Sequence, residues 1–256
     1  MNHGVAILLL LGAVLTSAHA QTRGLTGASD AWPPYVDPDE PGMGLCVQVV
    51  RESLASQGLS LTMTILPWVR AELAVREGTI DLLPDTWWTT DRTRDYLYSD
   101  PYLTTEIRFL KRRGDPFEYT GLPSLKGKRV GTIRGYGYDD AFLSDPGFER
   151  IEANDFLANI RNLLAGRIDL TLEEPFVAAA LLQKADLSLA SRVRFTQNPL
   201  ALRKMYLVVG LRNPRAREIV DAFNRGLGVL TSNGRLAEIL GTVAGQPRSG
   251  SGNLLR

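Results

Sequence analysis

The sequence predicts an α/β fold of two similar lobes with mostly parallel sheets. Strand and helix patterns alternate along almost the whole chain of 256 residues, the order typical of βαβ units. The chain also repeats itself. Residues 74–83 (AVREGTIDLL) and 162–172 (NLLAGRIDLTL) each combine a helix end, a Gly, an Ile-Asp pair and a short strand. Two modules of similar plan favour two lobes over one large sheet.

The strands are predicted from alternating or short apolar runs. A first strand is expected before Trp32, and residues 59–66 (LSLTMTIL) alternate strictly between apolar and polar side chains, as a half-buried strand does. The other predicted strands are short apolar runs at 80–83, 129–133, 168–172, 193–196 and 205–211.

The helices are predicted from apolar residues at helical spacing. Leu45, Val49, Val50 and Leu54 recur at this spacing, and Gly58 is a natural stop signal. The further predicted helices span residues 138–143, 155–164, 175–184, 214–230 and 234–240.

The Gly- and Pro-rich segment 111–125 is the expected passage between the lobes. We therefore predict a first lobe formed by residues 21–110 and 205–245, and a second lobe formed by residues 111–204. The Gly- and Ser-rich end, residues 246–256, is predicted to be a flexible tail.

Residues 1–20 have the features of a secretory signal peptide. Residues 5–15 form an apolar run too short to span a membrane, and Ala18-His19-Ala20 is an A-x-A cleavage signal. No Cys follows at the cleavage point, so a lipid anchor is not indicated. We expect export to the periplasm, with cleavage after Ala20.

Composition excludes several classes of function. The 29 Lys and Arg residues balance 28 Asp and Glu residues, which argues against a nucleic-acid surface. Both histidines, His3 and His19, lie in the signal segment, so triad catalysis and His-ligated metals are excluded from the mature chain. The single Cys46 cannot form an intrachain disulfide, and its apolar surroundings favour an inert core thiol. Most enzyme classes are therefore disfavoured.

Tryptophans cluster with an arginine in residues 66–102. Trp68, Trp87 and Trp88 provide flat apolar faces, and the guanidinium of Arg92 can give a carboxylate two parallel hydrogen bonds. The alternatives are core packing for the tryptophans and, for Arg92, a surface charge paired with Asp91 or Asp95. Adjacent residues of an extended chain point to opposite sides, so Trp87 and Trp88 cannot both enter one core.

Three further features could carry function. Trp32 begins a Trp-Pro-Pro-Tyr turn after the first strand, where α/β proteins bind ligands. Gly135-Tyr136-Gly137 could offer backbone N–H groups to an anion, but it lacks the spacing for a dinucleotide and a Walker Lys, so no cofactor is expected. The adjacent carboxylates of residues 173 and 174 could receive an ammonium or act as an acid, or could simply cap a helix.

These features together resemble the type II periplasmic solute-binding proteins of ABC importers, in the family that binds polar amino acids. The most specific part is Thr-Thr-Asp-Arg at residues 89–92, followed by Ser-Asp-Pro-Tyr at residues 99–102, similar to the family's Thr-Pro-Glu-Arg and Phe-Ser-x-Pro-Tyr. The resemblance implies that Arg92 binds the ligand carboxylate and Thr89 lends backbone contacts. It also places Trp32 and Trp68 on either side of the ligand.

The resemblance assigns the second lobe a share of the site. Gly135 and Gly137, on either side of Tyr136, match the turn that completes the carboxylate site, and Glu174 falls where an Asp usually takes the ammonium. Because Pro175 comes one position early, Glu173 is an alternative to Glu174.

Two first-lobe residues depart from the family pattern. Asp85 stands where the family usually has Gly, and Trp87 stands where it often has a small residue. Both changes narrow the expected pocket, and Asp85 adds an acidic group to it.

The resulting prediction is a non-enzymatic, monomeric periplasmic protein that captures an amino-acid-like or carboxylate ligand by hinge closure, for ABC-importer membrane subunits. One alternative is a dehydratase-like enzyme on the same fold with Glu173 or Glu174 as general acid. Another is a ligand-binding component of a different periplasmic system.

Overall fold

The computed structural model describes residues 23–244. The predicted signal peptide and tail lie outside these residues. No helix within residues 23–244 is both long and apolar enough to cross a membrane.

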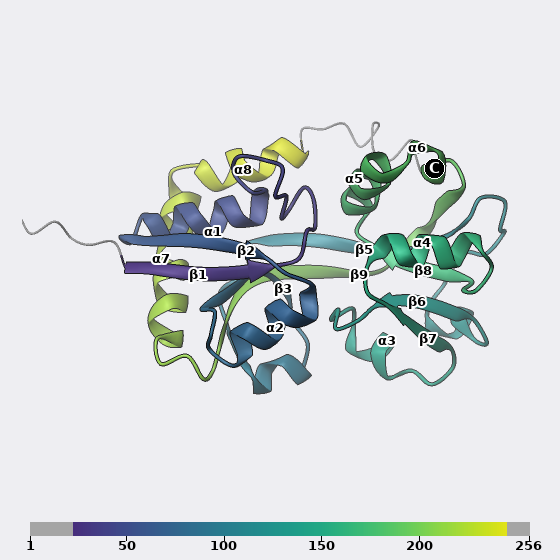
Figure 1. Ribbon diagram of the computed structural model, residues 1–256, viewed down its shortest axis with the longest axis horizontal. Coiled ribbons are helices and arrows are strands. Elements are labelled where there is room, and N and C mark those ends of the chain that lie inside the picture. The colour runs from purple at the N-terminus through teal and green to yellow at the C-terminus, as the bar shows by residue number, and fades with distance from the viewer. Residues whose placement is uncertain (1–22, 245–256) are drawn as a thin grey trace, which may run out of the picture.

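The described residues form a nine-stranded sheet in the order β2-β1-β3-β9-β5-β8-β6-β7, with β4 paired to β9 (Figure 1). The strands are β1 (Arg23–Ser29), β2 (Leu59–Ile65), β3 (Leu82–Trp87), β4 (Tyr96–Tyr98), β5 (Leu103–Arg112), β6 (Arg129–Ile133), β7 (Glu149–Ala153), β8 (Leu170–Glu173) and β9 (Val193–Gly210). The helices are α1 (Leu45–Ala55), α2 (Trp68–Arg76), α3 (Asp140–Ser144), α4 (Phe156–Leu164), α5 (Pro175–Ala185), α6 (Leu187–Ala190), α7 (Ala216–Ser232) and α8 (Arg235–Ala244), with 3-10 turns η1 (Asp91–Arg94) and η2 (Leu122–Leu125).

The sheet has a parallel part in each lobe. In the first lobe, defined here by β1–β4 with α1, α2, α7 and α8, strand β1 runs parallel to β2 and β3. In the second lobe, defined by β6–β8 with α3–α6, strand β6 runs parallel to β7 and β8. Helices cover both faces of the sheet (Figure 1). The predicted α/β fold is therefore confirmed, but one continuous sheet runs through both lobes where separate sheets were predicted, because β5 and β9 pair along their length.

The repeat seen in the sequence is also a repeat in structure. In the first lobe, the Asp81 carboxylate accepts a hydrogen bond from the Thr26 amide of β1 over 2.8 Å. In the second lobe, the Asp169 carboxylate accepts the same kind of bond from the Arg129 amide of β6, also over 2.8 Å. Each Ile-Asp pair thus ties the start of one strand to its parallel neighbour.

Two long antiparallel strands join the lobes. Strand β5 pairs with β9 from Leu103 opposite Met205 to Arg112 opposite Val193, and the register shifts on both sides of Arg108. Strand β5 was not predicted, because its polar residues obscure its apolar face. Strand β9 was predicted as two strands, because residues 197–204 lack an apolar run. Both predicted lobe limits, 110/111 and 204/205, fall inside these two strands.

The first-lobe core depends on a close approach between α1 and α7. Gly226 of α7 faces the backbone of α1, and a Cβ added there would lie 2.0 Å from the Ser53 carbonyl oxygen. Cys46 is fully buried in this core, as predicted, and burial raises the pKa of its thiol.

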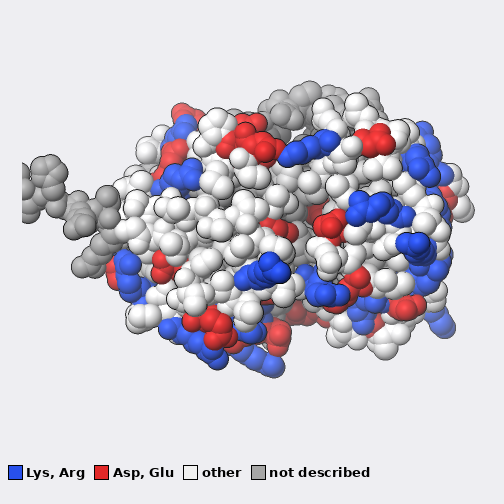
Figure 2. Space-filling model, in the orientation of Figure 1, with Lys and Arg blue, Asp and Glu red and all other residues white. Residues whose placement is uncertain are grey.

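On the face of the molecule drawn in Figure 2, basic and acidic side chains are interspersed, consistent with the formal net charge of +1.

Candidate functional site

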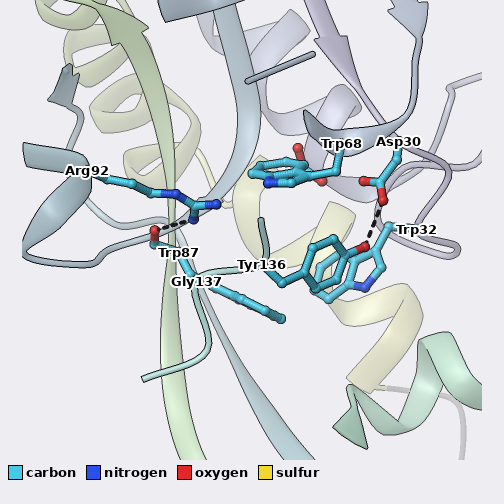
Figure 3. Close-up of a pocket in the computed structure, with 8 residues that line it drawn as sticks. Asp30, Trp32, Trp68, Trp87, Arg92, Tyr136 and Gly137 are labelled. Atoms are coloured by element: carbon cyan, nitrogen blue, oxygen red, sulfur yellow. Dashed lines mark hydrogen bonds between the residues drawn. The ribbon is translucent and has the colours of Figure 1, made fainter. Parts of the chain in front are cut away.

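A small cavity of about 20 Å³ lies between the two lobes. The first lobe contributes most of its lining, and the turn after β6 contributes the rest (Figure 3). The lining residues are Asp30, Trp32, Trp68, Asp85, Trp87, Arg92, Tyr136 and Gly137. The structure therefore gathers seven of the predicted site residues around one cavity.

The side chains that line the cavity are positioned by strands and by the segments that directly follow them. Trp32 follows β1 in a tight turn closed by paired hydrogen bonds between the backbones of Trp32 and Val36, and Asp85 and Trp87 lie on β3. Trp68 begins α2 directly after β2, and Tyr136 follows β6. The cavity thus lies where the carboxyl ends of parallel strands meet, the usual ligand position in α/β sheets.

Arg92 is buried, with 7% of its surface exposed, so its interpretation as a surface charge is wrong. Its Nε donates to Glu72 Oε1 over 2.9 Å, which makes Glu72 its ion-pair partner. Its Nη1 donates to the Trp87 carbonyl over 3.1 Å, and its Nη2 donates to the Gly135 carbonyl over 2.8 Å. Arg92 therefore links the first lobe to the turn of the second.

Aromatic rings form much of the cavity wall. Trp32 and Trp87 meet edge to face with ring centroids 5.5 Å apart. Tyr136 lies edge to face against both Trp68 and Trp87, with 5.8 Å between ring centroids in each pair. Trp88, the neighbour of Trp87, is 42% exposed. The adjacent tryptophans thus point to different environments, as expected.

Two carboxylates line the cavity. Tyr136 donates a hydrogen bond from its hydroxyl to Asp30 Oδ2 over 2.7 Å, and Ser29 donates one from its hydroxyl to Asp85 Oδ1 over 2.8 Å. Burial raises the pKa of Asp30 to about 6. Burial, with a smaller effect of the Asp30 charge, raises the pKa of Asp85 to about 8. Desolvation favours the neutral carboxyl in both cases.

The two adjacent glutamates have different partners. Glu174 caps α5, because its Oε2 accepts a hydrogen bond from the Val177 amide over 2.9 Å. Glu173 faces the first lobe, and its Oε1 accepts from Trp32 Nε1 over 3.0 Å. Burial raises the pKa of each to about 8. Neither lines the cavity, so the ammonium contact predicted for Glu174 is not visible in this arrangement.

The turn at residues 135–137 approaches the first lobe closely. Gly135 has φ of 79°, a left-handed conformation that favours glycine, and its carbonyl also accepts from Trp68 Nε1 over 3.0 Å. A Cβ added to Gly137 would lie 2.6 Å from Arg92 Nη1 and 2.8 Å from Thr89 Cγ2. Thr89 itself is buried and accepts from the Arg92 amide over 3.3 Å. Gly135 and Thr89 thus support the cavity without lining it.

Two residues of this site, Asp30 and Glu72, were not predicted from the sequence. Asp30 carries one weak signal, since it follows the first strand directly and precedes the Trp32 turn by two positions. Glu72 lies one helical turn after Trp68 on the same face of α2, a spacing that brings side chains together. Neither signal distinguishes these residues from ordinary surface acids.

Comparison with known proteins identifies the family. Residues 25–245 match the model of the bacterial extracellular solute-binding proteins, family 3. The L-cystine-binding protein TcyJ of Escherichia coli is 24% identical over 170 residues, which cover 65% of this chain and 64% of that protein. The aligned region therefore spans less than two thirds of the relative's length.

Solved structures share the fold. An ancestral arginine-binding protein bound to arginine has a TM-score of 0.72 at 20% identity, covering 86% of this chain and 97% of that one. A histidine kinase sensor domain with similarity to periplasmic binding proteins has a TM-score of 0.75 at 20% identity, covering 87% of this chain and 95% of that one. Because the family model spans nearly all described residues, this chain belongs to the bacterial extracellular solute-binding proteins, family 3.

Proposed function

We propose that this protein binds a small amino-acid-like ligand in the cavity between its lobes and closes around it. The observation that carries the proposal is the two-sided lining of the cavity. Asp30, Trp68 and Arg92 come from the first lobe, and Tyr136 and Gly137 come from the second. A ligand that contacts both sides binds the closed arrangement better than an open one, so it shifts the population toward closure.

The hinge is proposed to lie in β5 and β9, the strands that connect the lobes. Their pairing loses register next to Ile107, Arg108 and Leu110, opposite residues 195–201 of β9. Where the hydrogen-bond ladder between β5 and β9 is interrupted, we expect the paired strands to bend more easily than where it is regular. The lobe limits of residues 110/111 and 204/205 lie close to this bend.

Arg92 is the proposed carboxylate contact. A guanidinium has five N–H donors, and the contacts of Arg92 with Glu72, Trp87 and Gly135 use three of them. The remaining donors belong to the two terminal nitrogens, which are the atoms that form paired bonds with carboxylates. The relatives named for binding cystine and arginine support an amino-acid ligand.

Membership of this family supports a proposal for the cellular role of the protein. The family is described as extracellular, which supports an exported, periplasmic protein with the signal peptide predicted at residues 1–20. We propose a monomer that delivers its ligand to ABC-importer membrane subunits. The similarity to a histidine kinase sensor domain keeps a signalling partner as the alternative.

The dehydratase-like alternative is not favoured. The cystine-binding and arginine-binding relatives are binding proteins, and Glu173 and Glu174, the proposed acids, do not line the cavity. A general acid must come within hydrogen-bond reach of its substrate, and Glu174 is engaged in capping α5.

Calorimetric titration tests the proposal. Amino acids and small carboxylates are first screened by thermal shift, since a cleft ligand stabilises the fold according to its saturation. The ligand found is then titrated into wild type, Arg92→Ala and Arg94→Ala. Arg94 lies in the same turn, but its side chain is 77% exposed and it does not line the cavity.

We expect about tenfold or greater weakening for Arg92→Ala, from the loss of charge-assisted hydrogen bonds, and unchanged affinity for Arg94→Ala. If wild type and Arg92→Ala bound the ligand with equal affinity, Arg92 would not be a ligand contact. A screen without any ligand would contradict the proposed function itself.

A further inference from the structure

The side chain of Tyr136 fills the space between the tryptophans of the first lobe. It comes from the second lobe, packs edge to face on Trp68 and Trp87, and donates its hydroxyl hydrogen to Asp30 (Figure 3). The cavity that remains is about 20 Å³, whereas a single water needs roughly 10–15 Å³ by the same measure. An amino acid does not fit beside the phenol, so Tyr136 has to move before a ligand can enter.

A second hollow adjoins the residue Tyr136. Its volume is about 370 Å³, and Tyr136 is part of its wall as well as of the cavity wall. The other residues that line it are Thr132, Ile133, Gly135, Tyr138, Leu143, Arg150 and Glu152. Glycines flank Tyr136 on both sides, and glycine backbones rotate more freely than others. The phenol therefore has space beside it, and the turn becomes free to move once the hydrogen bonds that the Gly135 carbonyl accepts from Arg92 and Trp68 are broken.

The charges around the phenol favour a cation in its place. Asp30 and Asp85 both line the cavity, and neither forms an ion pair with a Lys or Arg among the described residues. Arg92, the one cation among the described residues that line the cavity, is already paired with Glu72. The raised pKa values of Asp30 and Asp85 agree with this, because burial disfavours the charged form of each carboxyl, and the opposing effect of the Arg92 charge on Asp85 is smaller.

We infer that Tyr136 is a gate that competes with the ligand for the space between Trp68 and Trp87, and that the ligand group taking this space is a compact organic cation held by Asp30 and Asp85. This inference rests on the proposed function and specifies the ligand. Indole faces attract alkylammonium and guanidinium groups, and a carboxylate accepts charge-assisted hydrogen bonds from them. The cation then replaces both contacts of the phenol, its ring packing and its bond to Asp30.

Competition by Tyr136 lowers the apparent affinity, because only the fraction of molecules with the phenol displaced can bind. Tyr136→Ala removes the competitor, so affinity rises. Tyr136→Phe keeps the ring but loses the hydrogen bond to Asp30, so affinity rises by less. Tyr206→Phe is the control, because Tyr206 is a half-buried tyrosine that packs on Tyr98 and does not line the cavity.

The experiment is calorimetric titration of the mature protein with two pairs of isosteres, arginine with neutral citrulline and choline with neutral neohexanol. We expect the charged member of at least one pair to bind wild type about tenfold or more tightly than its neutral partner. We expect Tyr136→Ala to tighten its binding by about tenfold, Tyr136→Phe to do so less, and Tyr206→Phe to leave it unchanged. Asp30→Asn should reduce the preference of the protein for the charged member of the pair over its neutral partner.

Equal binding within both pairs would overturn the cation assignment, and weaker binding by Tyr136→Ala would show that Tyr136 is a wall of the occupied site instead of a gate. If neither pair binds but the thermal-shift screen finds a neutral or acidic ligand, the proposed function stands and this inference fails. If the screen finds no ligand at all, both fail.

Discussion

The indole N–H of Trp32, in the first lobe, donates a hydrogen bond to Glu173 Oε1, in the second lobe, over 3.0 Å. Both side chains are buried, and the other carboxyl oxygen of Glu173 has no hydrogen-bond partner within residues 23–244. The bond therefore connects the lobes through a carboxyl group that burial keeps predominantly neutral at neutral pH. The same aromatic residue lines the cavity, so lobe contact and ligand site share one side chain.

Replacing Trp32 by Phe should destabilise the protein by about 1–3 kcal/mol, because Glu173 loses its indole donor while most of the ring volume is kept. Trp88→Phe, at an exposed tryptophan, should change stability by less than about 0.5 kcal/mol. Urea unfolding of both variants measures the difference. Equal effects would show that the bond between the lobes contributes nothing to stability.

Stability should fall as the pH rises from about 4 to 8. Asp85, Glu173 and Glu174 each have a pKa of about 8 in the folded protein, against ordinary values of 3.8 and 4.5. Between these values the folded state binds more protons than the unfolded state, so the free energy of unfolding decreases with pH. The contribution is fully present below pH 4 and is lost as the pH passes through 8.

Thermal unfolding at pH 5 and pH 8 tests this dependence, with the higher melting temperature expected at pH 5. Glu173→Gln should reduce the difference, since glutamine keeps an oxygen acceptor for Trp32 and does not ionise. A melting temperature that rises steadily from pH 5 to pH 8 would contradict the buried, neutral state of these carboxyls.

Two glycines of α7 should respond in opposite ways to Ala. Gly226→Ala places a Cβ 2.0 Å from the Ser53 carbonyl oxygen of α1, so the helices must separate, at a cost of about 1–3 kcal/mol. A Cβ added at Gly228 meets no described atom beyond its own turn of helix within 4 Å, so Gly228→Ala should stabilise the helix by about 0.5–1 kcal/mol. Chemical denaturation of the two variants compares them within one helix. Similar stabilities would disprove the tight contact between α1 and α7.

Gly137→Ala should impair ligand binding. The added methyl group would overlap Arg92 and Thr89, which forces either the guanidinium or the second-lobe turn away from its present position. We expect about tenfold or greater loss of affinity, because ligand contacts on the two lobes no longer align. Gly228→Ala serves as the control, and unchanged affinity in Gly137→Ala would show that this approach is not needed for binding.

Much of the site could be predicted because it depends on local order in the chain. Trp68, Trp87 and Arg92 lie close together in the chain, and their order, matched to the family pattern, predicted that they share one site. The structure confirms that they meet there. Their roles as ligand contacts remain predictions.

Other features depend on how the lobes meet and leave little trace in sequence. Whether Tyr136 reaches Asp30 is decided by the relative position of two lobes, and the bond joins residues far apart in the chain. Glu72 resembles any acid of an exposed helix until Arg92 is placed beside it. Strand β5 carries charged residues such as Glu106 and Arg108, whose charges pair with each other beside the sheet and conceal the strand pattern.

A crystal structure of the protein with the ligand found by screening tests binding between the lobes and displacement of Tyr136 together. We expect the ligand to lie between the lobes, to contact Arg92 or Asp30 on one side and the turn at residues 135–137 on the other, and to displace the Tyr136 phenol from Trp68 and Trp87. A ligand bound outside this cavity, or held by one lobe alone, would contradict this expectation.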